Sequence, residues 1–178
     1  MTILALDVGS SSVRAILFEN DESGVQIIPD AIVQRRYSFD TDDTGKSTVD
    51  ADFLRDLVET CIGEILRHPQ AHTIEAVGMD TFVGNLVAVD EQNEPLTPII
   101  TYADTRGSEH IAQFRHDLDT SQFHQETGTL CHTAYWPTKL NQFEYSPNLK
   151  SFMLTFQDFA TYCYRRWFRK SPMSFSVA

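Results

Sequence analysis

The stretch from residue 3 to residue 19, ILALDVGSSSVRAILFE, constrains the fold of this chain more than any other feature. Two apolar runs flank the small-residue turn Gly9-Ser10-Ser11-Ser12, which is the pattern of two strands joined by a tight hairpin. Glycine lets the backbone bend closely, and successive N–H groups and hydroxyls at one tip suit phosphate oxygens. The sequence therefore predicts an N-terminal hairpin whose tip can hold a phosphate.

Two charged residues border this turn. Asp7 ends the first apolar run, where it could hold a hydrated Mg²⁺ that bridges phosphates, and Arg14 could add a charge-assisted contact to the same phosphate. The same letters also fit an ordinary hairpin loop, since Gly and Ser are common in turns and Asp often ends a strand. The pattern is not a Walker loop, because no Gly-Lys pair with a following Ser or Thr closes the turn. Spacing alone leaves both interpretations open and favours the ordinary hairpin.

Composition limits the classes of partner. The 178 residues, 42% of them hydrophobic and 22% charged, are typical of one globular domain. A formal net charge of −11 argues against nucleic acid or an anionic membrane as partner. The cysteines Cys61, Cys131 and Cys163 have no metal-binding spacing and indicate free thiols in a reducing compartment. With no signal peptide and no membrane-length apolar run, we expect a cytoplasmic protein.

Local patterning predicts the remaining elements. Residues 25–35 alternate loosely and predict a third strand, and residues 40–47 predict an acidic loop. A helix is expected to open at residues 48–50 and to end at His68-Pro69, with a wide apolar stripe between them. Further strands are predicted at 73–79, 86–89 and 99–102, and helices at 106–117, 120–126 and 154–169.

Several segments together resemble a known family. LALDVGSSSVRAILF is similar to the first phosphate motif of the actin, Hsp70 and sugar-kinase superfamily, and three strands, a helix and a strand follow the order of its ribonuclease-H-like core. Pro95-Leu96-Thr97-Pro98, the motif Tyr102-x-Asp104-x-Arg106 and the stretch ending in Lys139-Leu140 narrow the resemblance to the FGGY carbohydrate kinases, gluconate-kinase-like and xylulokinase-like members above all. The resemblance implies an α/β fold with a mixed sheet and flanking helices.

The resemblance also implies an activity, the ATP-dependent and Mg²⁺-dependent phosphorylation of a hydroxyl group on a sugar, sugar acid or polyol. Asp7 would then position the metal, and the phosphate-binding residues would be Ser10, Ser11, Ser12 and Arg14. The substrate-binding residues would be Thr81, Val83, Gly84, Asn85, Asp104, Arg106 and Tyr135. The chain departs from the family at two places, because Val83-Gly84 replaces a pair that usually includes histidine and Tyr102 replaces the usual tryptophan.

Two residues of the substrate set have a second interpretation. Asp104 and Arg106 suit a local ion pair, and Asp104 or Thr105 suits the N-cap of the following helix, as well as a sugar contact. His132 is a weaker candidate for the sugar than Tyr135 and suits a capping or surface position. All these alternatives stay open at the level of the sequence.

The resemblance covers the N-terminal portion of such an enzyme. Residues 1–178 are therefore expected to form part of an FGGY N-terminal domain, and the aspartate base and the adenosine site are expected beyond Ala178. We assign no catalytic residue in this chain and expect it to be inactive alone, while the complete enzyme could form a homodimer. The alternative is a non-catalytic sugar- or nucleotide-binding module or an inactive fragment of the fold; an actin-like or chaperone-like ATPase shares only the hairpin.

Overall fold

The computed structural model describes residues 1–140 and 155–170. The chain divides into two compact units. Unit 1 comprises Met1–Phe39 and Ala51–Phe82, and unit 2 comprises Asp40–Asp50 and the described residues from Val83 onward. Each unit is built from two separate stretches of sequence, so contacts distant along the chain hold both together.

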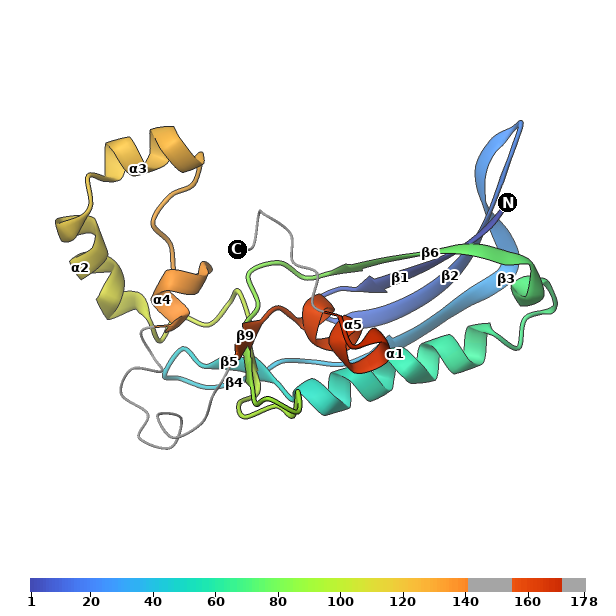
Figure 1. The fold of residues 1–178 in the computed structure, drawn as a ribbon, viewed down its shortest axis with the longest axis horizontal. Coiled ribbons are helices and arrows are strands. Elements are labelled where there is room, and N and C mark those ends of the chain that lie inside the picture. The colour runs from blue at the N-terminus through green and yellow to red at the C-terminus, as the bar shows by residue number, and fades with distance from the viewer. Residues whose placement is uncertain (141–154, 171–178) are drawn as a thin grey trace. The chain divides into compact units, whose positions relative to one another are not determined.

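Unit 1 is built on a four-stranded sheet with the order β3-β2-β1-β6 (Figure 1). The strands are β1 (Thr2–Val8), β2 (Ser12–Asp21), β3 (Gly24–Arg36) and β6 (Ile74–Thr81). The first three form an antiparallel meander, whereas β6 pairs with β1 in parallel. A parallel pair needs a crossover, and α1 (Ala51–Ile65) and the 3₁₀ helix η1 (Pro69–Thr73) supply it. The mixed sheet expected from the sequence is thus present.

The core of unit 1 lies between this sheet and α1, which packs against β2 and β3 (Figure 1). Successive residues of β1 alternate between buried and half-buried, and Leu4, Leu6 and Val8 are buried. The buried stripe of α1 consists of Ala51, Leu54, Val58, Cys61 and Ile65. It is narrower than the sequence predicts, because Phe53 on α1 and Leu66 just after it are exposed.

Unit 2 contains short strands and four helices. β4 (Asp40–Thr41), β5 (Ser47–Val49) and β8 (Ile99–Ile100) form one sheet, and β7 (Val87–Val89) pairs with β9 (Thr155–Gln157). The helices are α2 (Ser108–Asp117), α3 (Thr120–Thr127), α4 (Trp136–Leu140) and α5 (Phe159–Phe168). Across residues 1–140 and 155–170, every helix is too short or too polar to cross a membrane.

Three sequence-based assignments in unit 2 are wrong. Residues 47–49 form β5 rather than the opening of a helix, because Thr48 and Val49 pair with Ile100 and Ile99. Part of the predicted 40–47 loop is strand β4, which pairs with β5. The predicted helix over 154–169 is instead β9 followed by α5, since Gln157 pairs with Val87 and Asp158 caps the helix by accepting the Thr161 N–H at 2.6 Å. Each change depends on a partner far away in the sequence or on a cap.

The packing of α1 yields a stability prediction. Leu54→Ala should lower the free energy of unfolding by about 2–5 kcal/mol, because it removes a fully buried side chain and leaves a cavity. Leu66→Ala is the matched control, since Leu66 is 52% exposed, and should cost less than about 0.5 kcal/mol. Urea unfolding of the two variants measures the difference; equal losses would show that α1 does not pack on the sheet as described.

Candidate functional site

The hairpin between β1 and β2 has a narrow tip in unit 1. The Gly9 N–H donates to the Ser12 carbonyl at 3.0 Å, which leaves Ser10 and Ser11 as the two exposed turn residues. Gly9 is not in the left-handed region, and a Cβ there would meet its nearest atoms at 3.6 Å, an ordinary contact. The bend therefore does not require a glycine at this position. Ser12 is buried, so the tip presents two hydroxyls rather than three.

A row of charged side chains crosses the sheet beside this tip. Arg14 on β2 is the register partner of Asp7 on β1, and its Nη1 lies 2.8 Å from Asp7 Oδ2. On the other side, Asp7 is in register with Asp80 on β6, and Thr81 follows opposite Val8. The Asp7 side chain is 37% exposed, so it lies at the surface and not in the apolar interior. The sequence did not predict that Asp80 lies beside Asp7, because only the pairing of β6 with β1 brings the two together.

This row suits a magnesium ion bound together with phosphate. Within the described part of the chain, no group of three or more His, Cys, Asp or Glu side chains is placed to hold a metal. Mg²⁺, however, is usually held by one or two carboxylates together with waters and substrate phosphates. Asp7 and Asp80, in register on neighbouring strands, match that requirement, and Arg14 occupies only Oδ2 of Asp7.

Tyr37, directly after the end of β3, supports the hairpin tip. This role was not predicted from the sequence. The Tyr37 N–H donates to the Ser11 carbonyl at 3.1 Å, and the Tyr37 hydroxyl donates to the Gly9 carbonyl. The Tyr37 ring meets Phe39 edge to face, and Phe39 packs on Phe82 with ring centroids 5.3 Å apart. The signal available was the alternation of two aromatic residues directly after a predicted strand, which favours packing over a solvated loop.

In unit 2, Asp104 and Arg106 form a local ion pair. Asp104 has no exposed surface, and Arg106 Nη2 lies 2.6 Å from its Oδ2. The Ser47 N–H donates to the same oxygen at 3.0 Å, and the Arg106 N–H donates to Oδ1 at 3.1 Å. The N-cap of α2 is Gly107, with no side-chain hydrogen bond, so the capping interpretation of Asp104 and Thr105 is wrong. Of the ion pair, only Arg106 reaches the surface, with a side chain 35% exposed.

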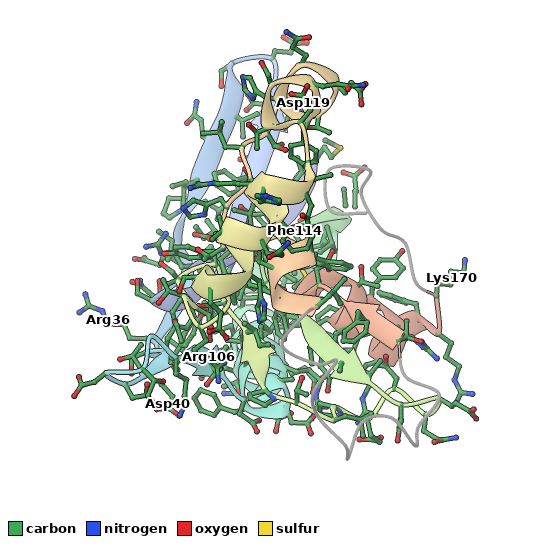
Figure 2. The ribbon with its side chains drawn as sticks, turned by 90° about the vertical axis from the view of Figure 1, so that its left-hand side faces the viewer. Arg36, Asp40, Arg106, Phe114, Asp119 and Lys170 are labelled. Atoms are coloured by element: carbon green, nitrogen blue, oxygen red, sulfur yellow. The ribbon has the colours of Figure 1, made fainter. Side chains whose placement is uncertain are left out.

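Figure 2 shows where Arg106 lies relative to the helices that follow. Arg106 lies just before the first turn of α2, and Asp119 lies beyond the last turn, where α3 begins. Asp119 caps α3 by accepting the N–H groups of Ser121 and Gln122, each at 3.0 Å. A side chain therefore fixes the start of α3, whereas no side chain caps the start of α2.

Gly84 occupies a position that admits no side chain. Its φ is +65°, and a Cβ there would lie 2.8 Å from the Ala134 carbonyl oxygen and 3.2 Å from the Cβ of Tyr102. The structure thus brings the predicted site residue Gly84, together with Tyr102, next to the segment that carries Tyr135. Val83 is 78% exposed and Tyr135 is 45% exposed, so both present surface to a ligand.

Asn85, also predicted to contact substrate, is buried and engaged. Its Oδ1 accepts the Phe159 N–H at 2.6 Å, at the start of α5. Its carbonyl oxygen accepts Trp136 Nε1 at 2.9 Å, at the start of α4. Asn85 therefore links the starts of α4 and α5 to the 83–85 loop. Its place in a substrate-loop motif did not predict this structural role.

Lys139 is the second fully buried charged residue of this region. Its Nζ donates to the Thr133 carbonyl at 3.0 Å and to the Ala134 carbonyl at 2.6 Å. Burial lowers the pKa of Lys139 to about 8, and the Asp104 carboxylate opposes that fall. The sequence identified this lysine only as part of a family pattern, since nothing local in it indicates that the ammonium group is buried.

Comparison with known proteins identifies the family. The sequence profile described as "FGGY family of carbohydrate kinases, N-terminal domain" matches residues 2–146. The chain belongs to the FGGY family of carbohydrate kinases. The gluconokinases of Bacillus subtilis (strain 168) and Bacillus licheniformis are each 25% identical over 130 residues, which cover 73% of this chain and 24% of each relative. This FGGY chain thus spans about a quarter of the length of the curated relatives that it matches.

Solved structures confirm the fold. Gluconate kinase from Lactobacillus acidophilus superposes with a TM-score of 0.76 at 19% identity, over 93% of this chain and 32% of that one. Xylulose kinase from Rhodospirillum rubrum superposes with a TM-score of 0.83 at 18% identity, over 93% of this chain and 33% of that one. The predicted membership and the predicted ribonuclease-H-like class are therefore both confirmed, with a match to part of each neighbour.

The burial of Lys139 predicts a pH dependence of stability. The unfolded chain keeps this proton up to the ordinary pKa of 10.5, whereas the folded chain releases it near pH 8. Between these values the unfolded state binds more protons, so raising the pH favours the folded state. The free energy of unfolding of the wild type should therefore rise relative to that of Lys139→Met from about pH 8 to about pH 10.5. Urea titrations of both proteins across this range test it, and a constant difference would show that the ammonium group is not buried.

Proposed function

We propose that this FGGY chain is the substrate- and phosphate-binding N-terminal part of an enzyme that transfers the γ-phosphoryl group of ATP to a hydroxyl of a sugar, sugar acid or polyol. The observation that carries the proposal is the exposed Ser10-Ser11 tip beside the Asp7–Arg14 pair, within a domain that matches the family profile. Phosphoryl transfer depends on positioning and charge stabilisation more than on covalent help from the protein, and the tip offers donors for both.

The residues of the tip have distinct tasks in this proposal. The hydroxyls of Ser10 and Ser11 donate hydrogen bonds to phosphate oxygens, while Arg14 contributes positive charge that Asp7 partly offsets. Ser12 is buried, so its contribution is to the shape of the turn. Mg²⁺ neutralises phosphate charge when bound, and Asp7 with Asp80 beside it would hold the ion.

Unit 2 supplies the groups proposed to contact the substrate. Arg106 can donate to hydroxyls or to a carboxylate, and the exposed ring of Tyr135 suits the apolar edges of a sugar. Gly84 and Val83 form the neighbouring main chain, and buried Asp104 and Asn85 act by holding Arg106 and the 83–85 loop in place. Because the curated relatives are gluconokinases, a sugar acid is the first substrate class to test.

The remaining parts of the reaction need groups from elsewhere in the complete enzyme. We propose that the aspartate base and the adenosine site lie in regions outside the matched quarter, and that residues 1–178 together form part of the N-terminal domain. Cys61, Cys131 and Cys163 are free thiols, which agrees with a reducing compartment, so we place the activity in the cytoplasm, where ATP is abundant.

A second candidate is a non-catalytic sugar- or nucleotide-binding module. The specific observation in its favour is that Gly84 excludes any side chain, Val83 is apolar, and Asn85 and Asp104 are buried, so four positions of the substrate set offer no exposed polar side chain. Such a module would keep ligand affinity without turnover. The two candidates therefore differ in a single measurable property, the release of ADP.

The test is a substrate screen with the full-length protein. Mg-ATP is combined with hexonates, pentuloses and polyols, and ADP release is measured together with the phosphorylated product. A kinase should release ADP only with one substrate class. Calorimetric binding of a sugar without ADP release would support the non-catalytic module instead, and neither binding nor turnover with any of these compounds would overturn both candidates.

The role of Asp7 gives a more local prediction. Asp7→Asn in the full-length protein should lower kcat by about a hundredfold, because it removes a charge that the phosphate-bound metal needs. The sugar KM should change by less than about twofold, since uniform binding of the sugar is not affected. Asp43→Asn, which removes an exposed carboxylate from a loop, is the charge-matched control. An unchanged kcat in Asp7→Asn at saturating Mg²⁺ would remove Asp7 from the mechanism.

A further inference from the structure

We propose that Lys139 is a positioning residue that fixes residues 133–135 against Gly84, and that it thereby sets the affinity of the enzyme for its sugar. The proposal rests on the proposed kinase function for its kinetic consequence, and on unit 2 alone for its structural part. No partner or ligand from outside this unit enters the argument.

The first step is the environment of the Lys139 ammonium. The side chain has no exposed surface, and its Nζ donates to the carbonyl oxygens of two consecutive residues, Thr133 and Ala134. A buried ammonium is costly unless hydrogen bonds replace its hydration, so these two carbonyls cannot turn away without a large penalty. Two consecutive carbonyls converging on one donor fix the peptide between them, directly before Tyr135.

The second step is the contact between the Ala134 carbonyl and Gly84. The Ala134 oxygen, 2.6 Å from Lys139 Nζ, lies where a Cβ on Gly84 would approach it to 2.8 Å. Gly84 also has a φ of +65°, which disfavours residues with a side chain. One oxygen atom therefore lies close both to the lysine of α4 and to the main chain of the 83–85 loop, and both neighbours must keep their present form for it to stay there.

The third step is that further hydrogen bonds tie this segment to the same elements. Trp136 Nε1 donates to the Asn85 carbonyl at 2.9 Å, and the Thr138 hydroxyl lies 2.9 Å from the Tyr135 carbonyl and 3.1 Å from the Thr133 carbonyl. Tyr135 itself stays exposed. Its ring is thus a surface group on a fixed backbone, which suits recognition of the C–H edges of a polyhydroxylated ligand.

The kinetic test uses the full-length protein. Lys139→Met, which keeps the length of the side chain but removes its donor, should raise the sugar KM about tenfold, the effect of losing a hydrogen bond from a charged group. Its kcat and ATP KM should stay within about twofold, because the residue touches neither the phosphates nor the reacting hydroxyl. Lys139→Arg should restore part of the affinity. Lys46→Met, which removes a surface ammonium paired with Asp40, is the matched control and should behave as the wild type.

A double-mutant cycle tests the shared oxygen. Gly84→Ala should also raise the sugar KM about tenfold, because the added Cβ displaces the Ala134 carbonyl. Combining it with Lys139→Met should add little, since both changes disturb one segment. A combined increase of about a hundredfold would mean that the two sites act independently and would overturn the proposal. So would a Lys139→Met variant whose sugar KM equals that of Lys46→Met.

Hydrogen exchange separates this proposal from the proposed function. Amide exchange of residues 132–136 should accelerate in Lys139→Met and in Gly84→Ala, but not in Lys46→Met, whether or not a sugar substrate is found. Unchanged exchange in both variants would overturn the positioning role, while absence of turnover in the wild type would overturn only the kinase function. If Lys139→Met fails to fold, Lys139→Arg and Gly84→Ala decide by the same two readouts.

Discussion

The pairing of β1 on both of its edges determines where the reactive groups of unit 1 lie. β1 is antiparallel to β2 and parallel to β6, and its alternation buries Leu4, Leu6 and Val8. Asp7 consequently points to the other face, between Arg14 and Asp80. A shift of one residue in either ladder would exchange the two faces and turn Asp7 towards the core, so the apolar packing against α1 is what specifies the charged row. The hydrophobic core and the proposed phosphate site are two consequences of one register.

In unit 2, buried charged side chains rather than regular secondary structure hold several loop segments in place. Two fully buried charges, Asp104 and Lys139, each bind main-chain groups of segments that are distant in sequence or outside regular elements. Asp104 accepts the N–H of Ser47, and Lys139 donates to the 133–134 turn. Removing Asp104 would take its partner from the Ser47 N–H, and removing Lys139 would take its partner from the Ala134 carbonyl; leaving such a group unsatisfied costs more than the net value of the bond. Buried polar groups thus specify the course of these segments alongside the apolar core.

Local signals in the sequence were sufficient for some of this architecture. The hairpin, the β3 strand and α1 follow from periods of two and 3.6 residues, which depend on neighbours within a few positions. β5 and β9 were not predicted, because each is a strand of three residues whose partner lies far along the chain. The family resemblance supplied the class of function and the motif around Asp104, but it could not distinguish an ion pair from a helix cap. Only the structure shows that Arg106 donates to both carboxylate oxygens of Asp104 and that Gly107 is the N-cap of α2.

Gly84 shows why a departure from a family pattern is not in itself evidence of lost function. At the level of the sequence, the resemblance implies a pair that usually includes histidine where this chain has Val83-Gly84, which suggests a missing contact. In the structure, the Ala134 carbonyl fills the space beside Gly84, and its oxygen accepts a hydrogen bond from Lys139 Nζ. A main-chain oxygen bound to a buried ammonium is more rigid than a side chain that must choose a rotamer, so the exchange trades a flexible contact for a fixed surface. The surface beside Gly84 is therefore formed by a fixed main-chain segment together with the exposed ring of Tyr135.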